Sequence, residues 1–215
     1  MYLIVTRSFP PELGGMQSLM WGLSRELSKN FMIKVFADYI EDHKTFDEQA
    51  SFSIERVGGI KLLRKYRKAQ LINEFIKENK IEGIIADHWK CLELIKSNKK
   101  KYCLIHSKEI NHPKGTGLNK RVLNVLNHVE KVIANSEYTK NLAIVCGVRE
   151  EKIITINPGI DPAEEIEKKS LNKVESLLKI KTPRLITVSR FDKRKNHEKV
   201  VMALRNLKQI YPDIV

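Results

Sequence analysis

Short apolar runs alternate along the chain with longer segments in which apolar residues recur every three or four positions. Residues 2–6 are almost all apolar and the run is short, which is typical of a strand buried in a parallel sheet. Residues 15–29 have the periodicity of a helix, whose apolar face comprises Met16, Leu19, Met20, Leu23 and Leu27. This alternation predicts an α/β protein with a Rossmann-like parallel sheet that carries helices on both faces.

The alternation continues through the rest of the chain. Strands are expected at residues 33–37, 53–57, 81–86, 102–105, 131–134 and within 150–156. Helices are expected at residues 61–78, 91–97, 118–129 and from Ser136, a helix-capping residue, to Gly147, a helix-stop residue. The polar residues 38–50 are predicted to form a loop. Near the end, residues 185–188 are expected to form a strand and residues 197–209 a helix.

These elements divide into three parts. Residues 1–163 are predicted to form an amino-terminal Rossmann-like domain, and residues 164–182 an interdomain segment with a short helix at 173–178. Residues 183–215 would begin a second Rossmann-like domain. Because one strand and one helix cannot form a stable sheet, this second domain would be incomplete. We therefore expect the chain to be a fragment of a longer protein and to be inactive alone.

The composition excludes several classes of protein. With 215 residues, 42% hydrophobic and 30% charged, the chain can bury a core and is neither disordered nor fibrous. No apolar run approaches the ~20 residues of a membrane span, and the first residues lack the basic lead-in of a signal peptide. The cysteines contain no Cys-x-x-Cys pair, which favours reduced thiols in the cytoplasm: Cys91, Cys103 and Cys146.

The formal net charge of +13 is large for a chain of this size. It predicts attraction to a nucleotide, an anionic membrane surface or a nucleic acid, although a lysine bias over solvated faces explains it equally well. Five basic residues cluster at the start of one predicted helix: Lys61, Arg64, Lys65, Arg67 and Lys68. A basic amphipathic stretch can lie on anionic lipid headgroups, and a helix with a solvated cationic face has the same pattern.

Two places along the chain carry residues suited to binding phosphate. Arg190 follows the run 185–188 and Lys195 precedes the next helix, at the strand end where ligands bind open α/β sheets. A solvated basic turn is the alternative. Gly14 and Gly15 stand at the start of the first helix, where glycine lets a ligand approach the main-chain N–H groups. A simple tight turn also explains them.

Histidines follow two of the predicted strands. His106 comes directly after residues 102–105, so we expect it over the same sheet edge as Gly15. By residue type alone, a lone histidine is more often structural. His88 and Trp89 follow residues 81–86 and could line the same cleft, but a loop histidine and a half-buried tryptophan are the simpler interpretation.

Four stretches together resemble the family-four retaining glycosyltransferases of the GT-B fold. Residues 10–15 resemble the family's Pro-Pro-x-x-Gly-Gly loop, and residues 106–109 its His-Gly-x-Glu motif with Ser107 in place of Gly. The signature that closes the first domain is matched by Ser136, Thr139, Lys140, Gly159 and Asp161. Residues 189–196 resemble the Gly-Arg-Leu…Lys-Gly pattern, with substitutions at Ser189, Phe191 and Asn196.

The resemblance implies catalytic and donor-binding roles. Arg190 and Lys195 would hold the diphosphate of a nucleotide sugar and stabilise the charge of the leaving group. Gly14 and Gly15 would face the donor phosphates, and His106 would contact the transferred sugar near the reaction centre. The donor, UDP- or GDP-linked, is a substrate. No cofactor is expected, and no metal either, because the sequence has no Asp-x-Asp or His/Cys ligand cluster.

The resemblance also bears on the acceptor. Glu109 and Ser136 would contact the sugar or the acceptor, a cell-surface glycan or lipid-linked saccharide. The protein would then be cytoplasmic and peripheral on the inner face of the membrane. Residues 1–163 would be the acceptor-side domain, and residues 183–215 the start of the nucleotide-sugar-binding domain.

Other classes of protein remain as alternatives. The main one is a non-catalytic basic Rossmann-like module that binds anionic membrane or nucleic acid, although no aromatic-rich basic platform or helix-turn-helix pattern supports nucleic acid. A GT-B sugar-nucleotide epimerase is disfavoured by the Arg190…Lys195 pair and by residues 135–161. A dehydrogenase is disfavoured because Gly-x-Gly-x-x-Gly is missing after the first strand.

Overall fold

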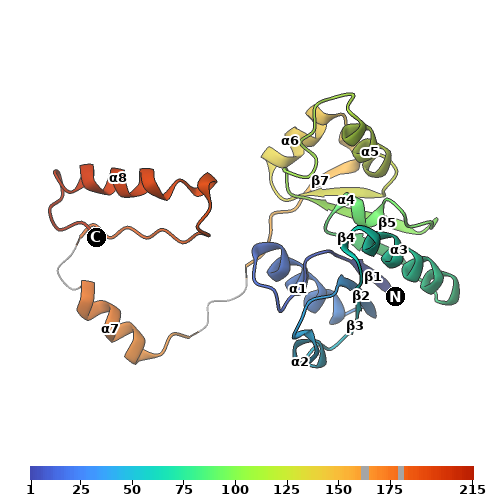
Figure 1. Cartoon of the computed structure of the whole chain (residues 1–215), viewed down its shortest axis with the longest axis horizontal. Helices are drawn as coiled ribbons and strands as arrows, with labels where there is room; N and C mark the ends of the chain where they lie inside the picture. The colour runs from blue at the N-terminus through green and yellow to red at the C-terminus, as the bar shows by residue number, and fades with distance from the viewer. Residues whose placement is uncertain (161–164, 179–181) are drawn as a thin grey trace. The chain divides into compact units, whose positions relative to one another are not determined.

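The computed structural model describes residues 1–160, 165–178 and 182–215. The chain divides into two compact units, Met1–Asp161 and Pro162–Val215, and each is described by itself (Figure 1). The predicted boundary after residue 163 falls outside the described residues, as does Asp161 of the family-like signature. None of the described helices is long and apolar enough to cross a membrane.

The first unit is built on a parallel sheet of seven strands in the order β3-β2-β1-β4-β5-β6-β7 (Figure 1). The strands are β1 (Tyr2–Val5), β2 (Ile33–Asp38), β3 (Ser53–Val57), β4 (Gly83–Ala86), β5 (Lys100–Ile105), β6 (Lys131–Ala134) and β7 (Ile153–Thr155). β1 lies between β2 and β4, so the strand order reverses there. The predicted Rossmann-like sheet is confirmed.

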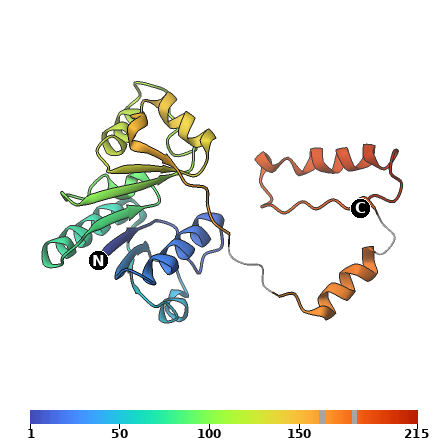
Figure 2. The ribbon, with the colours of Figure 1, turned by 180° about the vertical axis from the view of Figure 1, so that it is seen from behind.

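Helices cover both faces of this sheet, as predicted (Figures 1 and 2). The helices of this unit are α1 (Gly15–Ser28), α2 (His43–Glu48), α3 (Lys61–Glu78), α4 (Trp89–Leu92), α5 (Gly117–Leu126), α6 (Glu137–Cys146) and the 3₁₀ turn η1 (Glu150–Lys152). Side chains of α1 and α2 pack in one apolar cluster around Ile4, Met20 and Val35. Side chains of α3, α4, α5 and α6 pack in a second cluster on the other face.

Helix α6 begins and ends where its sequence signals predict. The Ser136 hydroxyl accepts a hydrogen bond from the Thr139 N–H (3.2 Å), which satisfies one of the free donors of the first turn. Gly147 follows the last turn with φ 103°, a left-handed conformation that glycine adopts without strain.

The loop predicted at residues 38–50 is wrong, because helix α2 forms within it. The helix has six residues and Phe46 is its single apolar residue, so it has no helical periodicity to read. Tertiary contacts hold it instead. The Phe46 ring lies edge-on to Trp21 (4.8 Å between centroids), and the Asp47 carboxylate binds Arg56.

The helix predicted at residues 91–97 is also wrong. Helix α4 is a single turn that begins at Trp89, before the predicted segment, and ends at Leu92. Beyond it the backbone bonds to α3, because Asn73 donates to the Leu94 carbonyl oxygen (3.1 Å) and accepts from the Lys96 N–H (2.8 Å).

The second unit contains α7 (Lys168–Leu178), the 3₁₀ turn η2 (Lys193–Lys195) and α8 (His197–Leu207). The strand predicted at residues 185–188 is wrong, since no described strand pairs with this run. Among the described residues, its one backbone hydrogen bond runs from the Leu185 N–H to the Val215 carbonyl oxygen (2.7 Å). Ile186 and Val188 are 87% and 85% exposed, so the run lacks the partners that a strand requires.

Candidate functional site

The carboxyl edge of the sheet gathers polar residues where the strand order reverses. Thr6 follows β1, and Asp87 follows β4, directly after the paired residues Val5 and Ala86. His106 follows β5 on the same edge. Because ligands of open α/β folds bind at such a reversal, this edge is the candidate site of the first unit.

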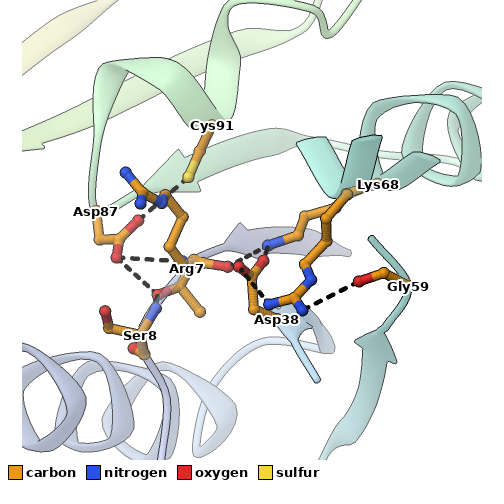
Figure 3. A network of polar contacts seen from close by, with 9 residues as sticks. Arg7, Ser8, Asp38, Gly59, Lys68, Asp87 and Cys91 are labelled. Carbon is orange, nitrogen blue, oxygen red and sulfur yellow. Dashed lines mark hydrogen bonds and ion pairs between the residues drawn. The ribbon is translucent and has the colours of Figure 1, made fainter. Parts of the chain in front are cut away.

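A buried network joins the ends of β1, β2 and β4 (Figure 3). The Thr6 hydroxyl donates to the Asp87 carboxylate (2.7 Å). The Lys68 ammonium donates to the Thr6 carbonyl oxygen (2.6 Å) and forms an ion pair with Asp38. Arg64 extends the network, with Nη1 3.5 Å from the same Asp38 carboxylate.

This network corrects the predicted role of Lys68, because the residue does not lie on the surface. It is 5% exposed, and its ammonium reaches from α3 to the strand ends. Arg64 is half-buried and donates to the Gly59 carbonyl oxygen (3.2 Å). The other three basic residues at the start of α3 are exposed: Lys61, Lys65 and Arg67.

Asp87 lies at the centre of the network and is 4% exposed. Burial raises the pKa of its carboxyl, and the hydrogen bonds from Thr6 and Cys91 oppose that rise. Burial also raises the pKa of the Cys91 thiol, whose Sγ lies 3.4 Å from Asp87 Oδ1. A thiol of raised pKa is a poor nucleophile, so this half-buried cysteine is structural.

The glycine pair stands at the start of α1. Gly14 is the residue before the helix, and its carbonyl oxygen accepts from the Ser18 N–H (3.0 Å). Gly15 is exposed, and a Cβ built on it would meet no atom within 4 Å. The start of the helix is therefore open on the side of Gly15 where a side chain would project, whereas at Gly14 that position is occupied by the Gln17 side chain.

A cluster that the sequence did not reveal anchors the loop before these glycines. The Arg56 side chain is 3% exposed and donates to the Pro10 carbonyl oxygen (2.5 Å). It also forms two hydrogen bonds with the Asp47 carboxylate, from Nη2 (2.6 Å) and Nε (3.0 Å). His43 Nδ1 lies 2.8 Å from the same carboxylate. Its members lie on β3, α2 and the loop, too far apart in sequence for a motif to show.

His106 is half-buried at the end of β5, and its buried Nε2 atom has no hydrogen-bond partner among the described residues. Burial lowers the pKa of its ring, and Glu109 and Asp87 oppose that shift. The Glu109 carboxylate accepts a hydrogen bond from the His106 main-chain N–H. Between them Ser107 has φ 83°, at the position where the resembling motif has glycine.

Ser136, which is also predicted to contact the sugar or the acceptor, uses its hydroxyl within the fold. Its hydroxyl caps α6 through Thr139 and lies 3.4 Å from Asn135 Oδ1. The Glu109 carboxylate is also used within the fold, because it accepts the hydrogen bond from the His106 N–H. Their contact with sugar or acceptor stays a prediction.

The predicted donor-phosphate residues lie in the second unit. Lys195 ends the turn η2, and Asn196 follows it with φ 53°. The Arg190 carbonyl oxygen lies 3.0 Å from His197 Nε2, which ties the residue to the start of α8. Both cationic side chains are exposed, and neither is in an ion pair within the described part of the chain.

A neighbouring acid in this unit is already neutralised. Hydrogen bonds from Arg194 lower the pKa of Asp192 to about 2, and the nearby charge of Arg190 lowers it further without forming an ion pair. Across the described residues, no group of three or more His, Cys, Asp or Glu side chains is placed to hold a metal ion.

The sequence model of Glycosyltransferase Family 4 matches residues 13–164. No curated protein matches the chain. Similar solved structures include HepE from Anabaena in complex with UDP and glucose (18% identity, TM-score 0.73) and a glycosyltransferase from Rickettsia africae (18%, 0.72). A third is sucrose-phosphate synthase from Thermosynechococcus elongatus (14%, 0.71).

These three matches cover 100%, 97% and 94% of this chain. The chain in turn spans 59%, 58% and 59% of the three solved chains. At such identities the structures show a shared GT-B fold. The family model covers more than half of the chain, and the protein therefore belongs to Glycosyltransferase Family 4.

Proposed function

We propose that the protein is a retaining glycosyltransferase that moves a sugar from a nucleotide-diphosphate sugar to a cell-surface glycan or lipid-linked acceptor. The family match over residues 13–164 carries this proposal and does not favour a non-catalytic module. HepE is a structural relative in complex with UDP and glucose, which supports a UDP-linked donor for this chain. The nucleotide sugar is a substrate, and the proposal requires no cofactor.

The chemistry follows from where charge develops. The bond from the anomeric carbon to the diphosphate breaks, the sugar becomes oxocarbenium-like, and negative charge grows on the leaving phosphate. Fixed cations at that phosphate stabilise the transition state more than the ground state. We assign this role to Arg190 and Lys195, whose side chains form no ion pair with a described carboxylate.

In the first unit, His106 is the group assigned to the transferred sugar. Its Nε2 atom has no hydrogen-bond partner among the described residues, and a sugar hydroxyl would supply one. Since burial lowers its pKa, the ring is neutral at physiological pH and does not oppose an oxocarbenium-like sugar. Gly15 is exposed at the start of α1, and the main-chain N–H groups there would face the donor phosphates.

The test is transfer or hydrolysis from a panel of UDP-, GDP- and ADP-sugars by the protein expressed from its complete gene. Arg190→Ala is expected to lower kcat by about 10²–10³-fold. Arg205→Ala, which removes an exposed arginine from the last turn of α8, is the control and should leave kcat unchanged. Ordinary turnover by Arg190→Ala would contradict the assigned role. Inversion at the anomeric carbon of the product would contradict retention.

We also propose that the start of α3 contacts an anionic membrane. Leu62, Leu63 and Tyr66 are 82%, 58% and 53% exposed there. Exposed cations alternate with these apolar side chains at Lys61, Lys65 and Arg67. Apolar side chains that enter the lipid interface beside cations that meet anionic headgroups are the arrangement of an interfacial helix.

A further inference from the structure

The sheet edge at the β1–β4 crossover carries donors that the proposed transfer chemistry does not use. Arg7 and His88 each lie two residues beyond Val5 and Ala86, the last paired residues of the two strands. Lys90 follows within α4, and its ammonium lies 5.3 Å from the centre of the Trp89 ring. These three side chains therefore come from adjacent strand ends on one edge of the sheet.

The network at this edge uses the main-chain N–H groups of Arg7 and Ser8 as donors. It does not use the Arg7 side chain. The Arg7 N–H lies 3.4 Å from Asp87 Oδ2, and the Ser8 N–H donates to the Thr6 hydroxyl (3.0 Å). The Arg7 side chain extends away from Asp38 on the Cys91 side of the network (Figure 3). A ligand at this point would therefore meet the guanidinium and not the backbone.

His88 is held as a neutral donor. Its Nδ1 atom accepts a hydrogen bond from the Lys90 N–H (3.0 Å), so the ring proton is on Nε2. Burial, followed by the charges of Arg7, Lys90 and His106, lowers the pKa of the ring to about 3. The ring therefore offers an N–H at every physiological pH.

The Arg7 and Lys90 side chains at this edge are not paired with carboxylates of the fold. Within the described residues, neither the Arg7 guanidinium nor the Lys90 ammonium takes part in an ion pair. Burial lowers the pKa of Lys90, and the positive charges of Arg7 and Arg121 lower it further. The carboxylate of Glu93 favours the charged lysine but is itself bound by Arg121 (2.7 and 2.8 Å). Like charges without an ion-pair partner at a strand-order reversal indicate a ligand site.

We propose that Arg7, His88 and Lys90 bind a phosphate group carried by the acceptor. All three groups donate hydrogen bonds and none accepts one towards the ligand, which suits phosphate oxygens. The choice of acceptor over donor rests on the proposed function, in which Arg190 and Lys195 of the second unit hold the donor diphosphate. The proposal thus selects a phosphorylated or diphosphate-linked acceptor over a neutral glycan.

The test is an NMR titration of the full chain that follows the His88 ring nitrogens, with inorganic pyrophosphate, geranyl diphosphate and UDP as probes. Pyrophosphate and geranyl diphosphate should shift the Nε2–H resonance, and UDP should not. Arg7→Gln should lower the affinity for both of these probes by about tenfold or more, and Lys90→Gln should lower it as well. The matched control is Lys99→Gln, which removes an exposed lysine just before β5, on the opposite sheet edge.

The possible outcomes are separable. Equal shifts with UDP, lost in Arg7→Gln, would support the phosphate site but overturn the acceptor as its source. An unchanged His88 resonance with all three probes at millimolar concentration would overturn the site. Equal weakening of probe binding in Arg7→Gln and Lys99→Gln would also overturn the site, since binding would then depend only on the overall charge of the protein. Sugar transfer is not measured, so failure of the proposed function would not mimic any of these results.

Discussion

Ser107 and Asn196 have backbone conformations that glycine adopts without strain. Their φ angles are 83° and 53°, and the motifs that they resemble have glycine at both positions. A residue with a Cβ pays a conformational penalty there, although asparagine tolerates it better than serine. Both positions therefore have a left-handed backbone that favours glycine, although this chain has Ser and Asn there.

The strain at Ser107 leads to a stability prediction. Ser107→Gly should raise the free energy of unfolding by about 0.5–1 kcal/mol, because glycine removes the left-handed strain but gains entropy in the unfolded chain. Urea denaturation, monitored by tryptophan fluorescence, measures this change in the free energy of unfolding. Ser53→Gly, in an ordinary strand, is the control and should be destabilising. A loss of stability in both variants would mean that Ser107 is not strained.

The fixed ring of His88 leads to a pH prediction. The folded-state pKa of about 3 lies below the ordinary value of 6.5, so the unfolded chain binds the proton first. Its contribution to stability is full above pH 6.5 and is lost as the pH falls towards 3, by at most about 1.4 kcal/mol per pH unit.

The check is to measure the free energy of unfolding by denaturant at several pH values, for the wild type and for His88→Asn. The variant keeps an acceptor for the Lys90 N–H but does not titrate. The wild type should lose more stability than the variant between pH 6.5 and 4. Parallel pH profiles would show that His88 titrates normally. The opposite contribution of Asp87, whose pKa is raised, is common to both proteins.

Residue identity predicted the place of His106 but not the burial of Lys68. A histidine after a parallel strand must lie at the carboxyl edge, wherever the strand sits in the sheet. Burial of a lysine depends on partners that other elements supply, here Thr6 after β1 and Asp38 at the end of β2. Neither partner is near Lys68 in the sequence, so the basic run looked uniformly solvent-exposed.

At the scale of elements, the Arg56–Asp47 pair couples β3 and α2 to the loop that precedes α1. Arg56→Ala should lower the free energy of unfolding by about 3 kcal/mol, because it leaves a half-buried carboxylate without its cation. Arg56→Lys should recover only part of this, since lysine cannot bind both carboxylate oxygens in the plane of a guanidinium.

A double-mutant cycle with Asp47→Asn isolates the pair in urea denaturation. The double variant should lose less stability than the sum of the single variants, with a coupling of about 1 kcal/mol or more. Additive losses would show that Pro10 and Phe9, not Asp47, account for the role of Arg56.

The exposed start of α3 leads to a prediction about lipid binding. Replacement of Lys61, Lys65 and Arg67 by Gln should reduce binding to anionic vesicles about 100-fold, at about 1 kcal/mol for each charge. Sedimentation with vesicles of phosphatidylglycerol and of phosphatidylcholine measures it. A triple Gln variant of Lys77, Lys80 and Lys99, away from this surface, is the control. Binding that ignores lipid charge would remove the proposal.

Elements with strong periodicity were predictable and those held by tertiary contacts were not. Helix α6 carries its own cap and stop at Ser136 and Gly147, so its bounds could be read from the sequence. Helix α2 has no periodic apolar face and forms because Phe46 and Asp47 find partners elsewhere. The run 185–188 has the composition of a strand, but a strand also needs a neighbour.

At the scale of the molecule, the sheet and its two helical layers followed from the alternation of elements along the chain. The strand order did not follow from this alternation, because periodicity indicates which segments are strands but not which strands pair with each other. The placement of β1 between β2 and β4 gathers Thr6, Asp87 and Arg7, so the network and the proposed phosphate site depend on topology that no local pattern encodes.

The central place of β1 also bears on how the protein is made. Strand β1 is synthesised before both of its neighbours, β2 and β4, and the last residue of β4 is Ala86. At about 5–20 residues per second, one edge of β1 waits several seconds for its partner during translation. An apolar strand with an open edge invites pairing with other chains. Nascent chains that end before β4 should therefore be protease-sensitive and prone to aggregate, and chains that extend past β5 should resist both.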